Sequence, residues 1–192
     1  MALRRLAVIS HSAVLEINQA VYRVLAAAHP ALELRLIVPQ RWRNSLTRGK
    51  WLQAAGREGV RPLPVRLAGQ INLHWYGPRL ERALRAFRPE VLLVIEEPYS
   101  LAAGQATRLA RKLGTRLAVY TNQNLLRRYP PPFAGLRARV LGQAERMLVP
   151  TEACAEVLRE LGYQRPIHHF PYPFALPEAA EPNPYLSERL GL

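Results

Sequence analysis

The sequence contains no aspartate, so all 14 of its acidic residues are glutamates. This absence excludes the phospho-acceptor aspartate of response regulators, the aspartate of Ser-His-Asp triads, and the Asp-x-Asp clamp that holds a metal in many nucleotide-sugar enzymes. Cysteine is nearly absent as well. With Cys154 as the only thiol, no intramolecular disulfide can form, and no cysteine–histidine cluster can bind a structural zinc ion. We expect Cys154 to be a small buried residue of an amphipathic helix.

Long apolar runs and glycine-rich phosphate motifs are also missing. No uncharged apolar run approaches the ~20 residues that a membrane-spanning helix requires. Neither Gly-x-Gly-x-x-Gly nor Gly-Lys-Ser/Thr occurs, which removes the motif support for dinucleotide binding and for P-loop ATPase activity. The apolar core of residues 1–10 is too short for a signal peptide and is typical of a strand. These features predict a soluble, intracellular protein.

Positive charge is what the sequence has in excess. The formal net charge is +13 over 192 residues, and 25 of the 27 cationic side chains are arginine. Arginine recognises phosphate and carboxylate groups through paired hydrogen bonds. The charge therefore favours nucleic acid, anionic lipid headgroups or phosphorylated substrates as partners. The length and the 49% of hydrophobic residues are those of a globular protein with one domain and a tail.

Short apolar runs alternate with amphipathic stretches along the chain, which is typical of a parallel β-sheet covered by helices. We expect strands at residues 6–9, 34–38, 64–67, 91–95, 117–120, 147–149 and 167–170. We expect helices at residues 13–28, 76–87, 101–113, 134–144 and 153–161. Residues 39–60 are less regular and predict a long loop with a short helix.

The composition changes near the end of the chain. Five prolines fall among the last 22 residues, and apolar periodicity stops there. This is linker composition. We therefore divide the chain into a folded domain over residues 1–170 and a proline-rich linker over residues 171–192.

Polar clusters follow three of the expected strands. Ligands of open α/β sheets bind outside the carboxyl ends of the strands, so these clusters predict one polar crevice. The candidate lining residues are His11, Ser12, Glu96, Glu97, Tyr99, Asn122, Gln123 and Asn124. Any one of these polar loops, taken alone, fits a structural role better than a binding role.

Glu96 and Glu97 are the candidate catalytic acids, although the sequence assigns neither of them a catalytic role. As neighbours in an extended segment they would point apart. We expect one of them to face the crevice and the other to cap the helix that follows.

A basic and aromatic segment lies between the second and third expected strands. Because arginine and tryptophan interleave there, an anionic membrane surface could attract it at about 1 kcal/mol per cation. A solvated loop at the mouth of the crevice explains the same pattern. The candidate membrane contacts are Arg41, Trp42, Arg43, Arg48, Lys50 and Trp51.

Four segments, in their order and spacing, resemble the N-terminal half of family-4 glycosyltransferases of the GT-B fold. They are the first strand with Ser10-His11-Ser12, the corner Val38-Pro39-Gln40-Arg41-Trp42, the run from Arg88 through Glu96-Glu97-Pro98-Tyr99-Ser100, and Tyr120-Thr121-Asn122-Gln123-Asn124 followed by Tyr129-Pro130-Pro131-Pro132-Phe133. The resemblance implies an α/β fold with a single Rossmann-like domain, an open parallel sheet with helices on both faces, which holds the acceptor. A second Rossmann-like domain binds the nucleotide-sugar donor in that family.

The resemblance also implies a reaction. Sugar would pass from a nucleotide-sugar co-substrate to a glycan, a lipid-linked sugar or a small molecule, with retention of configuration and with neither a divalent metal nor a cofactor. We expect a cytoplasmic protein, peripheral at the inner face of the cell membrane. The tail resembles an interdomain linker, so we expect the donor domain to be missing from this chain. The chain alone would then be inactive, and its exposed docking face would promote self-association.

Two departures from the family pattern concern the site. Many relatives have a glycine pair after the first strand, where this chain has His11-Ser12-Ala13. Many also have a histidine where this chain has Glu96, which could accept a hydrogen bond from a sugar hydroxyl instead. The alternative function is a stand-alone arginine-rich module that binds nucleic acid. The spread of arginine over every expected helix argues against it.

Overall fold

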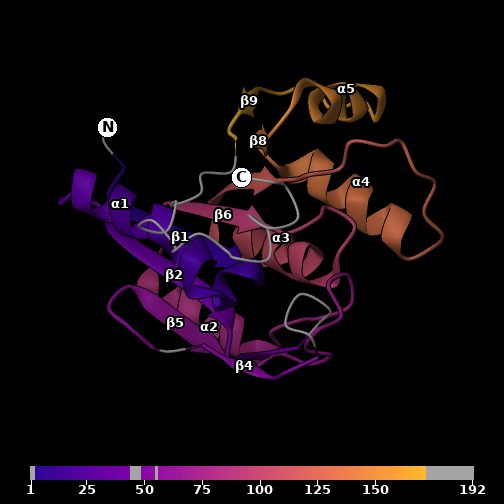
Figure 1. The fold of residues 1–192 in the computed structure, drawn as a ribbon. Coiled ribbons are helices and arrows are strands. Elements are labelled where there is room, and N and C mark those ends of the chain that lie inside the picture. Colours follow the sequence, from indigo (N-terminus) through magenta and orange to yellow (C-terminus); the bar gives the residue numbers. More distant parts are fainter. Residues whose placement is uncertain (1–2, 44–48, 55, 172–192) are drawn as a thin grey trace, which may run out of the picture.

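Seven parallel strands form a single sheet in the order β5-β2-β1-β6-β7-β8-β9 (Figure 1). The structure is a computed structural model, and it describes residues 3–43, 49–54 and 56–171. The strands are β1 (Arg5–Ser10), β2 (Glu33–Pro39), β5 (Val60–Leu63), β6 (Val91–Ile95), β7 (Arg116–Tyr120), β8 (Arg146–Val149) and β9 (Ile167–His169). Because every neighbouring pair is parallel, all seven carboxyl ends lie at one edge of the sheet.

Helices cover both faces of this sheet. They are α1 (Ala20–Ala28), α2 (Pro78–Phe87), α3 (Leu101–Leu113), α4 (Phe133–Gln143) and α5 (Glu152–Glu160). Alternate residues of β1 enter two separate hydrophobic clusters: Ala7 and Ile9 pack on the side of α2, α3, α4 and α5, whereas Leu6 and Val8 pack on the side of α1. The expected Rossmann-like α/β fold is confirmed.

Local sequence signals explain the best-predicted helix, α3. The Ser100 hydroxyl accepts a hydrogen bond from the backbone N–H of Ala103 at 3.1 Å and so caps the first turn. Gly114 ends the helix in the left-handed conformation, with φ of +65°, which a residue without Cβ adopts at low cost. Cys154 is buried in α5, as predicted.

The expected helix over residues 13–28 is wrong in its first half. Ser12–Val14 and Glu16–Gln19 form short 3₁₀ turns, and α1 begins only at Ala20. Side-chain amides compete with the helical pattern here, because Asn18 Nδ2 donates to the carbonyl of Ser12 and Gln19 Nε2 donates to the carbonyl of Ala13, both at 2.8 Å.

Two expectations between residues 39 and 67 are also wrong. The third strand is β5, Val60–Leu63, rather than residues 64–67. Pro62 lies within β5, which is an edge strand, where a residue without a backbone N–H is tolerated. In place of a short helix, the described part of residues 39–60 forms the antiparallel pair β3 (Arg41–Trp42) and β4 (Leu52–Gln53).

Two further expectations concern the linker and membrane-spanning helices. The predicted linker lies outside the described residues from 172 onward, so the proposed division of the chain stays a prediction. Among the residues that the structure describes, no helix combines the length and the apolar character needed to cross a membrane.

Candidate functional site

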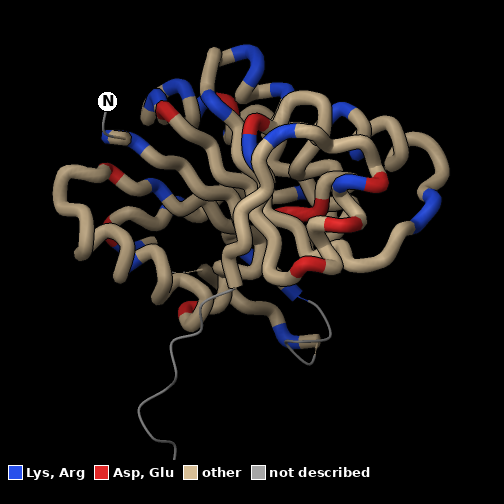
Figure 2. Tube along the Cα trace, turned by 90° about the horizontal axis from the view of Figure 1, so that it is seen from above, with Lys and Arg blue, Asp and Glu red and all other residues tan. Residues whose placement is uncertain are grey.

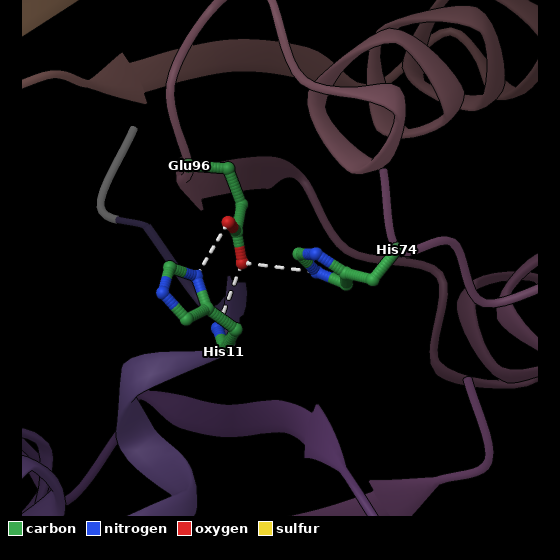
Figure 3. Close-up of side chains that lie close together, drawn as sticks. All are labelled: His11, His74 and Glu96. Carbon is green, nitrogen blue, oxygen red and sulfur yellow. Dashed lines mark hydrogen bonds and ion pairs between the residues drawn. The ribbon is translucent and has the colours of Figure 1, made fainter. Parts of the chain in front are cut away.

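A buried carboxylate lies where the chain leaves β6, at the carboxyl edge of the sheet. Glu96 Oε1 accepts the backbone N–H of His11 at 2.7 Å, and Glu96 Oε2 lies 2.6 Å from His11 Nδ1 (Figure 3). Strand pairing explains the contact, because β1 and β6 are parallel neighbours with Ser10 opposite Ile95. The residues that directly follow them, His11 after β1 and Glu96 after β6, therefore leave the sheet side by side. The site therefore follows directly from the sheet register.

Opposite charges stabilise this pair. Burial by itself would raise the pKa of Glu96, but the charge and hydrogen bond of His11, with a smaller contribution from His74, lower that pKa to about 2. Burial would likewise lower the pKa of His11, yet the charge and hydrogen bond of Glu96 outweigh burial and raise it. Both shifts favour the ion pair between an imidazolium and a carboxylate.

A second histidine, which the sequence analysis missed, completes the cluster. His74 lies in the loop between β5 and α2 and is fully buried. Its Nδ1 lies 2.9 Å from the carbonyl oxygen of Ile71 and 3.3 Å from that of Gln70; because carbonyl oxygens only accept, this nitrogen carries a hydrogen. Its Nε2 lies 3.6 Å from Glu96 Oε1, within reach of an ion pair but beyond a hydrogen bond.

Aromatic rings enclose the two imidazoles. The Trp42 ring lies 5.0 Å from the His11 ring and 4.9 Å from the His74 ring, the latter nearly edge-on at 84°. Tyr76 approaches His74 from another direction, with its ring centre 5.9 Å away. Trp42 follows the second predicted strand but was expected at a membrane surface, and His74 belongs to no motif, so the sequence analysis placed neither of them at the carboxylate.

Glu97 points away from Glu96, as predicted, and belongs to the next strand junction. It accepts a hydrogen bond from the Thr121 hydroxyl at 2.6 Å and another from the backbone N–H of Asn122 at 3.1 Å. Burial raises the pKa of Glu97 although these two hydrogen bonds oppose the shift. The expectation that one of the two glutamates caps α3 is wrong, because Ser100 does so.

The remaining predicted residues lie around these two contacts. Ser12 Oγ is 3.0 Å from Ser10 Oγ, and the Gln123 backbone N–H donates to the Thr121 hydroxyl at 3.1 Å. Asn122 and Asn124 are exposed. Tyr99 stacks on Tyr129 with ring centres 4.2 Å apart. The clusters after β1, β6 and β7 thus meet at one edge of the sheet, and their role in binding stays a prediction.

The basic and aromatic segment divides into a buried part and an exposed part. Trp42 is only 2% exposed, so the structure corrects its assignment as a membrane contact. Trp51 is 47% exposed, with the guanidinium groups of Arg41 and Arg43 at 4.8 and 4.9 Å from its ring. Lys50 is exposed, and Arg48 lies outside the described residues.

Within the described part of the chain, one group of side chains has the composition of a metal site. His11, His74 and Glu96 offer ligand atoms that all lie within 4.8 Å of one another. Two imidazoles and a carboxylate suit zinc. However, His11 Nδ1 and Glu96 Oε2 already bond to each other, so a metal would have to displace that contact and its proton.

Comparisons with known proteins agree with the geometry. The family model of Glycosyltransferase Family 4 matches residues 19–174. A UDP-GlcNAc 2-epimerase from Neisseria meningitidis, solved with UDP-GlcNAc bound, is similar with a TM-score of 0.52 and 16% identity over 85% of this chain and 45% of its own. A second UDP-N-acetylglucosamine 2-epimerase is similar with a TM-score of 0.54 and 13% identity, over 85% of this chain and 46% of its own length. The chain thus spans under half the length of either epimerase, and the likeness shows the fold. No curated protein sequence matches the chain.

Proposed function

Because the chain belongs to Glycosyltransferase Family 4, we propose that it is the acceptor-binding part of a retaining glycosyltransferase. Sugar would move from a nucleotide-sugar donor to a hydroxyl of a glycan, a lipid-linked sugar or a small molecule. We propose that this transfer uses no divalent metal. A chain without aspartate cannot form the Asp-x-Asp clamp through which many nucleotide-sugar enzymes hold one.

The observation that carries the proposal is the convergence of polar groups at the carboxyl edge of the sheet. His11 is held by Glu96, and the segment of Asn122 is held by Glu97. Groups fixed in this way lose little freedom when a ligand binds, so they suit recognition of sugar hydroxyls. This edge is also where open α/β sheets bind their ligands.

Donor binding is assigned to a partner domain. Retaining transfer requires stabilisation of the charge that develops on the leaving diphosphate. The junction after β1 has His11, Ser12 and Ala13 in place of a glycine-rich phosphate loop. We therefore expect no turnover when the chain alone is incubated with UDP-glucose, UDP-GlcNAc or GDP-mannose and methyl glycosides. Clear product formation without any added protein would contradict this assignment.

Large exposed apolar side chains occur in segments that follow strand ends. Seven of the eight found in the described chain lie in such segments. They are Ile17, Trp51, Leu67, Ile71, Leu125, Leu126 and Phe170. Exposed apolar surface favours docking of a partner, so these side chains support the proposal of contact with a donor domain and of self-association of the chain alone. The exposed Arg41, Arg43 and Trp51 support contact with an anionic membrane surface.

Binding of nucleic acid is the less favoured alternative. In the view of Figure 2, lysine and arginine are spread over many segments of the described chain rather than gathered along one of them. A nucleic-acid interface needs cations along one element or groove. The net charge of +13 therefore acts through the overall field rather than through a built site.

A binding experiment tests the proposed function. The ¹⁵N-labelled chain is titrated with methyl α-mannoside, methyl α-glucoside and methyl β-N-acetylglucosaminide, and amide shifts are followed by NMR. We expect millimolar affinity for at least one glycoside, with shifts concentrated at His11, Asn122, Gln123 and Asn124. Shifts confined to the hollow of about 740 Å³ that Tyr22 and Phe87 line, or none with any glycoside, would contradict the proposal.

A further inference from the structure

The two ring nitrogens of His11 have different surroundings. Nδ1 is bonded to the carboxylate of Glu96 at 2.6 Å, whereas Nε2 lies at the far side of the ring and points away from that carboxylate (Figure 3). The side chain of His11 is 18% exposed. One nitrogen is therefore committed to the protein, and the other is directed outward at the carboxyl edge.

Glu96 itself cannot meet a ligand. Its side chain is fully buried, and both oxygens already accept hydrogen bonds from His11. The expectation that Glu96 takes the hydrogen of a sugar hydroxyl is therefore wrong in this structure. His11 lies between the carboxylate and the exposed edge, and any effect of the carboxylate on a ligand must pass through its imidazole.

We infer that Nε2 of His11 is the atom that hydrogen-bonds the acceptor hydroxyl, and that Glu96 positions it, an inference that rests on the proposed function. The carboxylate accepts from Nδ1 and so keeps the hydrogen of the neutral ring on that nitrogen. Nε2 is then left to the hydroxyl: it accepts the hydroxyl hydrogen when the ring is neutral, and it donates to the hydroxyl oxygen when the ring is the imidazolium of the ion pair. Glu96 is thus a positioning residue that acts on the acceptor through His11.

The rings around His11 fix its orientation. The backbone N–H of His11 is held by the same carboxylate at 2.7 Å. The rings of Trp42 and His74 pack against the imidazole, with centres 5.0 and 5.5 Å away. A rotation of the ring that moved Nδ1 would break the Glu96 contact, and the neighbouring rings restrict the space for it. The outward direction of Nε2 is therefore a property of the packed site.

Two substitutions of His11 separate a structural role from contact with a ligand. In His11→Asn, the amide nitrogen replaces Nδ1 and can still donate to Glu96, but no atom replaces Nε2. In His11→Gln, a polar atom reaches the position of Nε2 and the contact with Glu96 is lost. Both variants are compared with the unmodified chain by denaturation and by titration with the methyl glycoside that binds the unmodified chain best.

The expected result is that His11→Asn, which keeps a hydrogen bond to Glu96 but loses the positive charge, loses part of the stability and roughly tenfold in glycoside affinity, the size of effect that one lost hydrogen bond produces. His11→Gln, which loses both the charge and the contact with Glu96, should lose more stability and retain more of the affinity. If His11→Asn binds the glycoside like the unmodified chain, the inference is overturned while the proposed function stands. If no glycoside binds the unmodified chain, the proposed function fails, and the inference falls with it.

The position of the proton gives a readout that needs no ligand. Long-range ¹H–¹⁵N spectra of the histidine-labelled chain should show the hydrogen on Nδ1 of neutral His11, and Glu96→Gln should move the titration of His11 to lower pH. Glu97→Gln, a matched change one residue away, should move it much less. A hydrogen on Nε2, or a titration that Glu96→Gln leaves in place, would overturn the positioning role of Glu96.

Discussion

Replacing Glu96 by glutamine tests how much the buried ion pair stabilises the domain. The substitution keeps the shape of the side chain and removes its charge. In the folded protein the pKa of Glu96 is lowered from its ordinary 4.5 to about 2. At 1.36 kcal/mol per unit, this difference corresponds to roughly 3 kcal/mol of stability near neutral pH. For a domain of this size that is about 6 to 12 °C in the unfolding temperature.

The pH dependence has a definite sign. A lowered carboxyl pKa stabilises the fold above pH 4.5, and this contribution is lost as the pH falls toward 2. The raised pKa of His11 stabilises the fold below its ordinary 6.5, and this contribution is lost as the pH rises through the raised value. The pair therefore contributes most between about pH 4.5 and 6.5. Glu96→Gln should be most destabilising, relative to the unmodified chain, in that window.

Urea denaturation followed by circular dichroism at pH 3, 4, 5, 6, 7 and 8.5 measures this difference. Glu97→Gln is the matched control and should show the opposite trend. Because burial raises the pKa of Glu97, its charged form destabilises the fold. Glu97→Gln should therefore cost the least stability above pH 4.5, where the unmodified chain carries that charge. The reasoning is refuted if Glu96→Gln is as stable as the unmodified chain at pH 5 to 6, or if the difference between them is the same at every pH.

Three further predictions follow from other contacts. Thr121→Val deletes the hydroxyl that donates to Glu97 at 2.6 Å and should cost about 1.5 to 3 kcal/mol in urea denaturation; an unchanged midpoint would contradict this value. After treatment with EDTA, isothermal titration with ZnCl₂ or MnCl₂ should show no one-to-one binding, because the proton between His11 and Glu96 occupies the ligand atoms; metal binding that His74→Asn abolishes would show the opposite. The chain should pellet with anionic vesicles at low salt, and Arg41→Gln with Arg43→Gln should reduce the bound fraction; equal pelleting with neutral vesicles would rule out the membrane contact.

The sequence by itself determined the fold class and the edge where the site lies. Val91–Ile95 is a continuous apolar run of five residues, which is typical of a central parallel strand buried on both faces. Ser100 and Gly114 bound α3 through interactions within a few residues. Parallel strands bring their carboxyl ends together, so the convergence of the groups after β1, β6 and β7 followed from the order of elements alone.

Tertiary structure decided which side chains complete the site and which of them meets the solvent. His74 reaches Glu96 from a loop, and Trp42 of β3 packs against His74; both positions depend on contacts far apart in the sequence, about which periodicity carries no information. The sequence also did not predict that the side chain of Glu96 is buried. It is buried beneath His11 because β1 lies next to β6 in a particular register, and a shift of one residue would turn both side chains to other faces.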